Sequence, residues 1–305
     1  MSDTQKFDLH YTGVYLQAAN CALVSSETAE LSGKNIAHTY VYLFFDGKWY
    51  TLERWPNAIV GMCHLGTDSI QLFFLCANGK VYKRVKGVIT EEIIDPSDEG
   101  PSDLLLMRNM IAVGEELIAV GMARRAYRRS QGGEWSAIDA TCFVSRKDRT
   151  SATGFNAVAA AGGTLIAVGH KGEIWRFDGQ QWSMEESRPN VTLTGVSATD
   201  EGDFVIVGLD GVIMRGAPGS WRTIDHGATT QNFWGVVLFQ DRMYVSNYGG
   251  VFCLNDSALE TVTIEPDREI STAYLSATRD AIWSVGVQDI YTSSDGVMWT
   301  RVENP

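Results

Sequence analysis

The sequence predicts an all-β protein, a seven-bladed β-propeller of four-stranded antiparallel blades. Three observations lead to this fold class: a strand pattern that recurs about every 40 residues, five tryptophans that each follow a tight turn, and a composition rich in glycine and poor in proline. Thirty glycines against seven prolines suit a chain with many short turns, because turns that need a positive φ favour glycine.

The repeated unit is clearest over residues 155–187 and 193–226. Each copy reads as an apolar strand, a short break, a second strand ending in Val-Gly, a third strand, a glycine-containing turn, and a tryptophan that opens a fourth strand. Runs rich in β-branched and aromatic residues between turn signals are typical of strands. The second-strand run recurs at residues 117–121, 165–169, 205–208, 243–247 and 283–286.

The turn-and-tryptophan element occurs five times, ending at Trp49, Trp135, Trp182, Trp221 and Trp299. The spacings between these tryptophans are 86, 47, 39 and 78 residues, so two further copies are predicted near residues 92 and 260. Both places hold a fitting strand. Residues 80–94 have Gly87 at the turn, and residues 249–265 have Leu259 where a tryptophan is expected.

The unit cannot bury its own surface, which favours a closed ring. Both faces of each small sheet carry apolar residues, and packing units side by side around an axis buries both faces while leaving only short protected edges. Residues 1–305 are therefore expected to form one propeller domain, with six or eight blades as alternatives. Neither terminus is required to supply a strand to the other end, although residues 6–11 could add one. The expected blades cover residues 6–55, 56–97, 103–142, 154–188, 190–227, 231–266 and 270–305.

Charge restricts the classes of partner. The net charge is −12 and the sequence pI is about 4.9, which argues against nucleic acid, since that partner needs a basic surface. It also disfavours an anionic membrane surface, and it is compatible with a basic protein partner. Residues 80–149 differ from the rest of the acidic chain in charge, because they hold 12 Lys and Arg against 11 Asp and Glu.

The five cysteines and the N-terminus indicate a cytoplasmic protein. Five is an odd number, the residues are scattered, and four lie in apolar runs, so buried reduced thiols are expected rather than disulfides or a metal site. The N-terminal residues show no signal peptide. No apolar run approaches the roughly 18 residues that span a bilayer.

The segment Tyr291-Thr292-Ser293-Ser294-Asp295-Gly296-Val297-Met298-Trp299-Thr300 resembles the Asp-box, or BNR, turn S-x-D-x-G-x-x-W of sialidase-type and photosystem II assembly factor-type propellers. It is one residue shorter than that motif and lacks its second glycine. The resemblance implies a propeller in which Ser and Asp side chains cap the turn between third and fourth strands, and it implies no chemistry. The arginine triad of the sialidases cannot be placed in this sequence.

Motifs for catalysis, cofactors and metals are missing. The five histidines form no H-x-H, H-E-x-x-H or Cys/His cluster with ligand spacing, and there is no G-x-S-x-G or P-loop. We therefore assign no catalytic residue, no cofactor and no metal ligand. Residues of different blades can nevertheless converge on the axis of a propeller, which leaves open a catalytic or metal site at the channel mouth.

The run MARRAYRRS places four arginines around Tyr127. Strand alternation puts them on both faces, so they cannot all serve one ligand. The two interpretations are solvated arginines paired with neighbouring acids, or a contact to an anion or acidic peptide.

In a propeller, the loops between second and third strands share one face with the blade-to-blade connections, and the tryptophan turns lie on the other. Candidate partner-binding residues on the first face are Trp55, Arg124, Arg125, Arg149, His170, Lys171, Asp210, His226, Tyr248 and Asp289.

The first functional hypothesis is a monomeric, non-catalytic propeller that binds a protein, in one version an immunity-type inhibitor of a bacterial toxin. An acidic surface would speed the capture of a basic partner. The alternative is a propeller enzyme, a lyase or glycan hydrolase, which requires His170, His226 and acids to cluster at the channel mouth. An assembly factor similar to that of photosystem II is a third hypothesis.

Overall fold

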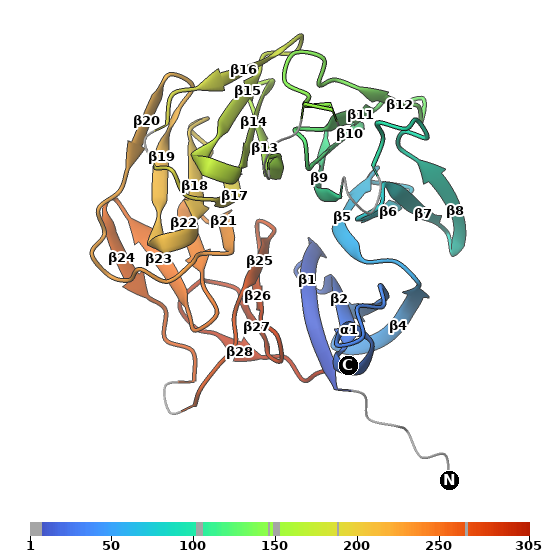
Figure 1. The fold of residues 1–305 in the computed structure, drawn as a ribbon. Coiled ribbons are helices and arrows are strands. Elements are labelled where there is room, and N and C mark those ends of the chain that lie inside the picture. The colour runs from blue at the N-terminus through green and yellow to red at the C-terminus, as the bar shows by residue number, and fades with distance from the viewer. Residues whose placement is uncertain (1–7, 102–105, 146, 149–152, 188, 266–267) are drawn as a thin grey trace.

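The computed structural model describes residues 8–101, 106–145, 147–148, 153–187, 189–265 and 268–305. In this part of the chain, seven four-stranded sheets are arranged around a central axis, with the first strand of each sheet innermost and the fourth outermost (Figure 1). Every strand pairs antiparallel with the next one along the chain. The predicted seven-bladed propeller of four-stranded blades is therefore confirmed.

The strands of the first three blades are β1 (Leu9–Ala18), β2 (Cys21–Thr28), β3 (Thr39–Phe45), β4 (Lys48–Trp55); β5 (Ile59–Leu65), β6 (Gln71–Cys76), β7 (Lys80–Val85), β8 (Val88–Ile93); and β9 (Met107–Val113), β10 (Glu116–Gly121), β11 (Ala126–Arg129), β12 (Trp135–Ala137). Those of the fourth and fifth are β13 (Phe155–Ala161), β14 (Thr164–Gly169), β15 (Ile174–Phe177), β16 (Trp182–Glu185); and β17 (Leu193–Ala198), β18 (Phe204–Gly208), β19 (Ile213–Ala217), β20 (Ser220–Thr223). Those of the sixth and seventh are β21 (Gly235–Phe239), β22 (Arg242–Ser246), β23 (Val251–Asn255), β24 (Ala258–Thr261); and β25 (Tyr274–Ala277), β26 (Ile282–Val285), β27 (Ile290–Ser293), β28 (Thr300–Arg301).

Within the described ranges, three short helices interrupt this pattern: α1 (Ala29–Ser32), η1 (His170–Gly172) and η2 (Leu209–Gly211). The first lies in the segment of the first blade that the sequence suggested to be a polar loop, where Thr28 caps it by accepting a hydrogen bond from the Leu31 amide. The other two are turns between second and third strands. In both turns the chain reverses direction over the few residues between the second and third strands.

The second strands are the best buried elements, which explains their uninterrupted apolar sequence. In β18 every residue is buried, and in β10 and β14 all but the first are. Each strand has a neighbouring blade on both faces, so apolar residues are needed at consecutive positions. One core cluster joins Ile166 and Val168 of the fourth blade to Phe204 and Ile206 of the fifth, and the other clusters likewise join neighbouring blades.

The two copies predicted from the tryptophan spacings are present as β8 and β24. Gly87 forms the turn before β8 with a φ of 86°. Leu259 lies in β24 and packs against the core between the fifth and sixth blades, as expected of a residue in the place of a tryptophan.

Three of the five repeated tryptophans also tie their blade to the preceding one. The indole nitrogen of Trp135 donates to Glu92 of the second blade at 2.8 Å, and that of Trp221 donates to Glu185 of the fourth blade at 3.2 Å. Trp49 of the first blade donates to the carbonyl of Glu303, which follows the seventh. The aromatic body fills the widening space between blades, and the polar edge bonds to the preceding blade.

Ring closure needs no exchanged strand, as the sequence suggested. The first and seventh blades each consist of four consecutive strands, and β1 packs beside β25 and β26 (Figure 1). One core cluster spans this contact and includes Leu16 and Val24 on one side and Trp283 and Ile290 on the other. The Tyr11 amide also donates to the carbonyl of Val287 at 3.0 Å.

Side chains cap the turn between β27 and β28. The Asp295 carboxylate accepts hydrogen bonds from the amides of Val297 and Met298, both at 2.8 Å, and the Ser293 hydroxyl accepts one from Gly296 at 2.8 Å. These backbone hydrogen bonds hold the pKa of Asp295 below its usual range. The capping expected of this segment is therefore present.

Replacing Asp295 by alanine should loosen this turn without unfolding the ring. The amides of Val297 and Met298 lose their acceptor, so their hydrogen exchange should accelerate by roughly tenfold through local opening. Exchange measured residue by residue by NMR tests this. The matched control is Asp280→Ala in another exposed turn of the same blade, which should leave both rates unchanged. Equal rates in the Asp295 variant and the wild-type protein would contradict the capping role.

All five cysteines are buried as free thiols, in agreement with the sequence-based expectation. Burial raises the pKa of Cys63 to about 12, so this thiol stays protonated and unreactive. Within the described residues, no helix has the length and apolar character needed to cross a membrane.

Candidate functional site

A cavity of about 350 Å³ lies in the central channel. Its walls come from the first strand of every blade, near the end where the chain enters each blade. This end of the channel shares its face with the turns between second and third strands, the face that the sequence predicts to carry the binding residues. A volume of this size admits a few side chains but no folded domain.

A β-bulge at the start of the first strand aims side chains into this cavity. In each of the first five blades the strand register shifts by one residue at this point, so one residue has no partner on the second strand. Bulges redirect side chains in this way. The bulged residues all line the cavity: Thr12, Val60, Arg108, Asn156 and Thr194.

In four of these five blades the residue after the bulge is glycine or alanine, because neighbouring blades approach closely here, and Asn109 is the exception. A β-carbon at Gly61 would stand 3.1 Å from Met110 of the next blade, and one at Gly195 would stand 3.1 Å from Val236 of the next. Larger side chains at these positions would push the blades apart at the axis. The sixth blade follows the same sequence pattern, with Trp234 before Gly235, and Trp234 lines the cavity as well.

Most polar groups of the cavity wall are already bonded within the protein. Thr12 donates to Ser25 at 3.0 Å, Asn156 donates to the carbonyl of Leu193 at 2.8 Å, and Thr194 donates to that of Phe233 at 2.6 Å. The wall is therefore held rigidly, and few of its polar groups are free to bind another molecule.

Positive charge lies on the side of the cavity formed by the third and fourth blades. Arg108 is exposed, and the described residues give its guanidinium no hydrogen bond or ion pair. His170, in the turn after β14, is close enough to be affected by it: burial and then the charge of Arg108 lower the pKa of His170, so the ring is neutral at neutral pH. Lys171 follows with a φ of 58° and is exposed.

Aromatic side chains lie across the cavity, in the sixth and seventh blades. Tyr248 is 56% exposed and packs against Trp234, with 5.3 Å between ring centroids. Tyr274 lines the cavity and is 37% exposed to solvent. Burial and then the nearby Tyr248 raise its pKa above the usual tyrosine value. The mouth thus combines arginine, tryptophan and tyrosine, the residue types that dominate binding energy at protein interfaces.

All four arginines of the run MARRAYRRS have acidic partners. Two of the four guanidinium side chains, those of Arg125 and Arg129, are buried. Arg124 makes a two-pronged ion pair with Glu173 of the fourth blade at 2.7 and 2.8 Å. Arg125 is buried between Asp95, at 2.9 Å, and Asp139, at 3.3 Å. Both join neighbouring blades, and neither guanidinium is available as an open anion site.

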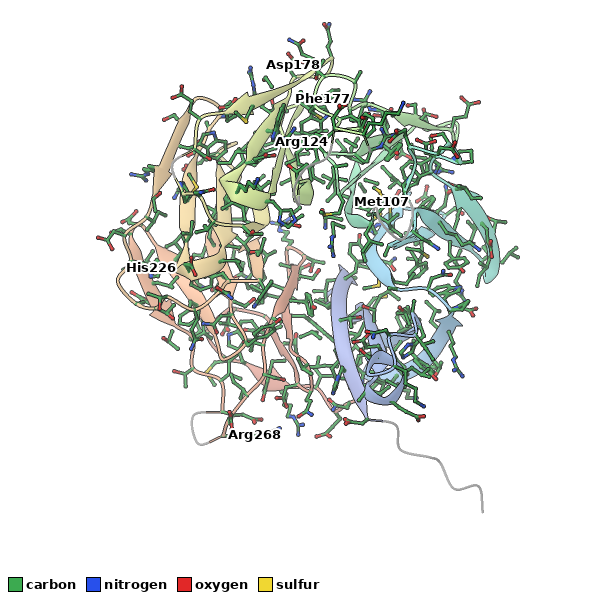
Figure 2. The ribbon with its side chains drawn as sticks, in the orientation of Figure 1. Met107, Arg124, Phe177, Asp178, His226 and Arg268 are labelled. Atoms are coloured by element: carbon green, nitrogen blue, oxygen red, sulfur yellow. The ribbon has the colours of Figure 1, made fainter. Side chains whose placement is uncertain are left out.

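The other two arginines of the run confirm the pairing with acids. Arg129 is buried and makes two hydrogen bonds of 2.7 Å to Glu92 of the second blade. Arg128 pairs with Glu116 at 3.6 Å on the surface. The expectation of solvated arginines was wrong for Arg125 and Arg129, because strand alternation turns them into the interface between blades. Figure 2 shows Arg124 on the third blade beside the fourth.

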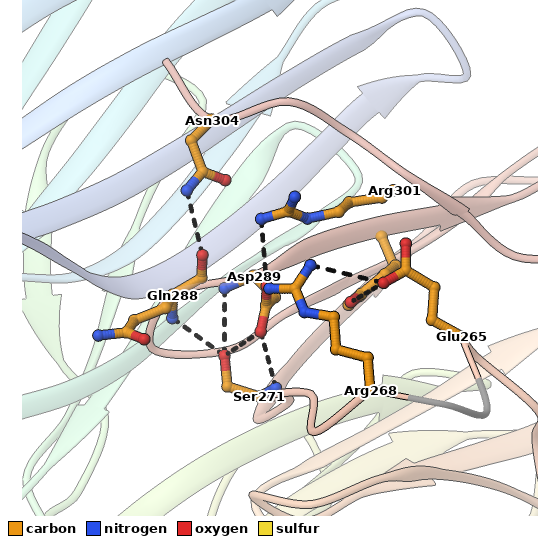
Figure 3. A network of polar contacts seen from close by, with 8 residues as sticks. Glu265, Arg268, Ser271, Gln288, Asp289, Arg301 and Asn304 are labelled. Carbon is orange, nitrogen blue, oxygen red and sulfur yellow. Dashed lines mark hydrogen bonds and ion pairs between the residues drawn. The ribbon is translucent and has the colours of Figure 1, made fainter.

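Other candidate residues serve the fold. Trp55 is buried and stacks on Tyr82 at 4.8 Å. Asp289 is buried in a network with Arg268, Ser271 and Arg301 (Figure 3). These two side chains are therefore enclosed by their neighbours.

Two further candidates lie in or beside the turns of the fifth blade. His226 uses both ring nitrogens on the backbone, at Gly211 and Ala228, and lies toward the periphery of the ring (Figure 2). Asp210 is exposed in the turn after β18, with a φ of 56°. Arg149 lies outside the described residues.

The cluster of His170, His226 and acids that the enzyme hypothesis requires is not found among the described residues. His226 is bonded to backbone, and neither it nor His170 has a hydrogen bond to a carboxylate there. No group of three or more His, Cys, Asp or Glu side chains that could hold a metal ion occurs in the same part of the chain.

Arg108, Trp234 and Tyr274 were missed by the sequence reasoning, although a signal existed. A triplet of a variable residue, a central residue, and Val or Met recurs in six blades, and the central residue is glycine or alanine in five of them. The triplets are Thr12-Gly13-Val14, Val60-Gly61-Met62, Arg108-Asn109-Met110, Asn156-Ala157-Val158, Thr194-Gly195-Val196 and Trp234-Gly235-Val236. Aligning the first strands on this triplet would have identified the variable residue as the one that faces the axis.

Seven four-stranded sheets around a lined channel place the chain in the class of seven-bladed β-propellers. The sequence is 31% identical over 297 residues to the immune protein Tsi7 of Pseudomonas aeruginosa, covering 96% of each chain. The chain therefore belongs to the family of this immune protein. No protein-family model matches it.

Solved structures agree on the fold. YCF48 bound to D1 peptide is similar with a TM-score of 0.67 and 11% identity, covering 98% of this chain and 93% of that one. Virginiamycin B lyase from Staphylococcus aureus is similar with a TM-score of 0.71 and 12% identity, covering 95% of each chain. The resemblance to photosystem II assembly factor-type propellers is thus confirmed for the fold, and identities this low carry nothing further.

Proposed function

We propose that this protein is an immunity protein that binds a bacterial toxin enzyme and blocks it without performing chemistry itself. The observation that carries the proposal is the similarity to an immune protein over 96% of both chains. The channel mouth supports it, because it offers a rigid wall with exposed Tyr248, Tyr274 and Arg108 around a space the size of a loop tip.

Charge and cysteine usage add to the proposal. A net charge of −12 would steer a basic toxin toward the protein and raise the association rate. Five free buried thiols suit a reducing compartment, so we propose that the protein acts in the cytoplasm, as a monomer.

The first experiment is co-expression with candidate toxins encoded beside this gene. Cells that produce the toxin should survive only when this protein is produced too, and the two proteins should co-purify in a fixed ratio. If no neighbouring product is toxic, or the toxin kills with this protein present, the proposal fails.

The second experiment tests the face that binds. Tyr248→Ala should weaken the affinity for the toxin by roughly 10- to 30-fold, because an exposed aromatic anchor of the mouth is removed. The matched control is Met298→Ala, 74% exposed in a turn on the opposite face, which should change the affinity less than about twofold. Isothermal titration calorimetry measures both. The reverse result would place the interface on the opposite face.

A further inference from the structure

The channel mouth of this acidic protein is lined by a cationic side chain and by no carboxylate of the described residues. The described residues that line it include one charged side chain, Arg108, and no aspartate or glutamate. The chain as a whole has 37 acidic residues and 25 basic ones. Other arginines of the same blade, Arg124, Arg125 and Arg129, are paired with carboxylates of this chain, whereas Arg108 has no carboxylate partner among the described residues.

The bulge explains why Arg108 has no partner in the described part of the chain. It lies between Met107 and Asn109, which pair with Gly121 and Val120 of the second strand, and is itself left out of the ladder. Its side chain is thereby turned toward the axis, away from the blade interfaces where the acids lie. A guanidinium carries five N–H donors in a planar fork that matches a carboxylate.

Asn109 adds a donor to the same wall. Its side-chain oxygen accepts a hydrogen bond from the Val158 amide at 3.2 Å, which orients the group. The described residues give its NH₂ no acceptor. Elsewhere on the wall the hydroxyl of Thr194 and the amide of Asn156 donate to backbone carbonyls. The donors available to a ligand are therefore concentrated at Arg108 and Asn109.

From this arrangement we infer that the mouth is a receptor for a carboxylate, supplied by an aspartate or glutamate at the tip of a loop of the protein partner. Charge complementarity identifies the group, because an unpaired guanidinium in a partly enclosed site binds a carboxylate through two parallel hydrogen bonds. The size of the cavity, about 350 Å³, limits the insert to a loop tip. Trp234 and Tyr248 on the opposite wall would contact the residues beside the carboxylate. This inference rests on the proposed function for the identity of the partner.

The first test uses the toxin partner. Arg108→Ala should weaken binding by about 100-fold, because the partner's carboxylate would be buried without its counter-charge. Arg108→Lys should recover only part of the loss, since an ammonium lacks the planar fork, and Arg108→Glu should bind more weakly than Arg108→Ala. The control is Arg279→Ala, an exposed arginine in the turn between β25 and β26 on the opposite face. If Arg108→Ala binds within about twofold of the wild-type protein, the inference is overturned while the proposed function stands.

The second test needs no partner. In protein labelled with ¹⁵N-arginine, the Nε–Hε signal of Arg108 should shift as sodium acetate replaces sodium chloride at constant ionic strength, while that of Arg279 should not. Equal responses of the two arginines would overturn the receptor. A response to inorganic phosphate but not to acetate would also overturn it and would indicate a site for a free oxyanion. This test still decides on the receptor when no toxin is bound by the protein, so the two proposals fail separately.

Discussion

Replacing Arg125 by methionine should lower the free energy of unfolding by about 3–5 kcal/mol at neutral pH, the usual effect of removing one partner of a buried ion pair. Arg125 lies between Asp95 of the second-to-third blade connection and Asp139 after β12, and it also donates to the Tyr127 hydroxyl at 2.6 Å. Methionine fills much of the volume but leaves both carboxylates facing an apolar side chain. Urea unfolding measures the difference.

The deficit should shrink in acid. Burial alone would raise the pKa of Asp95, but hydrogen bonds from Ser97 and Tyr127 and the charge of Arg125 outweigh it and hold the pKa below its usual range. In the wild-type protein this stabilisation is present above the unfolded-state pKa and is lost as the pH falls through the lower, folded-state pKa. Burial raises the pKa of Asp139 even with Arg125 present. Without Arg125 both carboxyls should protonate more readily, which relieves the penalty at low pH.

The control for Arg125 is Arg128→Met, which removes an arginine of β11, the strand that begins directly after Arg125. Its ion pair with Glu116 is exposed to solvent, so the change in stability should stay below about 1 kcal/mol. A deficit that is the same for both variants, or independent of pH between about 3 and 7, would contradict the role assigned to Arg125.

The fold could be predicted because its signals are local and repeated. The tryptophan after the outer turn recurs in five of the seven units and the apolar second strand in most of them, so a weak copy such as Leu259 is identified by its place between strong ones. Both faces of a blade are buried by its neighbours, which makes the second strand apolar at consecutive positions. These constraints act within about 40 residues of chain and are visible in one sequence.

The site could be predicted only by its face. Whether an arginine of the third blade can bind a partner depends on acids elsewhere in the chain. Glu92 forms an ion pair with Arg129, and Glu173 forms one with Arg124. Spacing along the chain does not reveal these pairs, because they form between blades. Arg108, in contrast, is isolated from its own blade by a one-residue bulge, and a shift of one residue decides whether a side chain faces the axis or the neighbouring blade.

Asp289 lies near the contact between the first and seventh blades, where the ring closes. Asp289→Asn should lower the free energy of unfolding by about 2–4 kcal/mol. The buried Asp289 carboxylate accepts hydrogen bonds from Arg268 at 2.8 Å and from the Ser271 amide at 2.9 Å, and Arg301 approaches it to 3.5 Å (Figure 3). Asparagine has the same shape but no charge, so Arg301 loses its counter-charge and Arg268 keeps only the exposed pair with Glu265. Asp210→Asn, in the corresponding exposed turn of the fifth blade, is the control and should stay within about 0.5 kcal/mol.

The loss should be concentrated at the contact between the first and seventh blades. Because each of these two blades is built from four consecutive strands of the described residues, this contact depends on side-chain packing, the Tyr11–Val287 backbone hydrogen bond and the segment around Asp289. In Asp289→Asn, hydrogen exchange should therefore accelerate most in β1, β25 and β26, with β14 and β18 on the far side keeping their protection until global unfolding. Uniform acceleration across all seven blades would show that the ring unfolds as one unit and that closure is no weaker than any other blade contact.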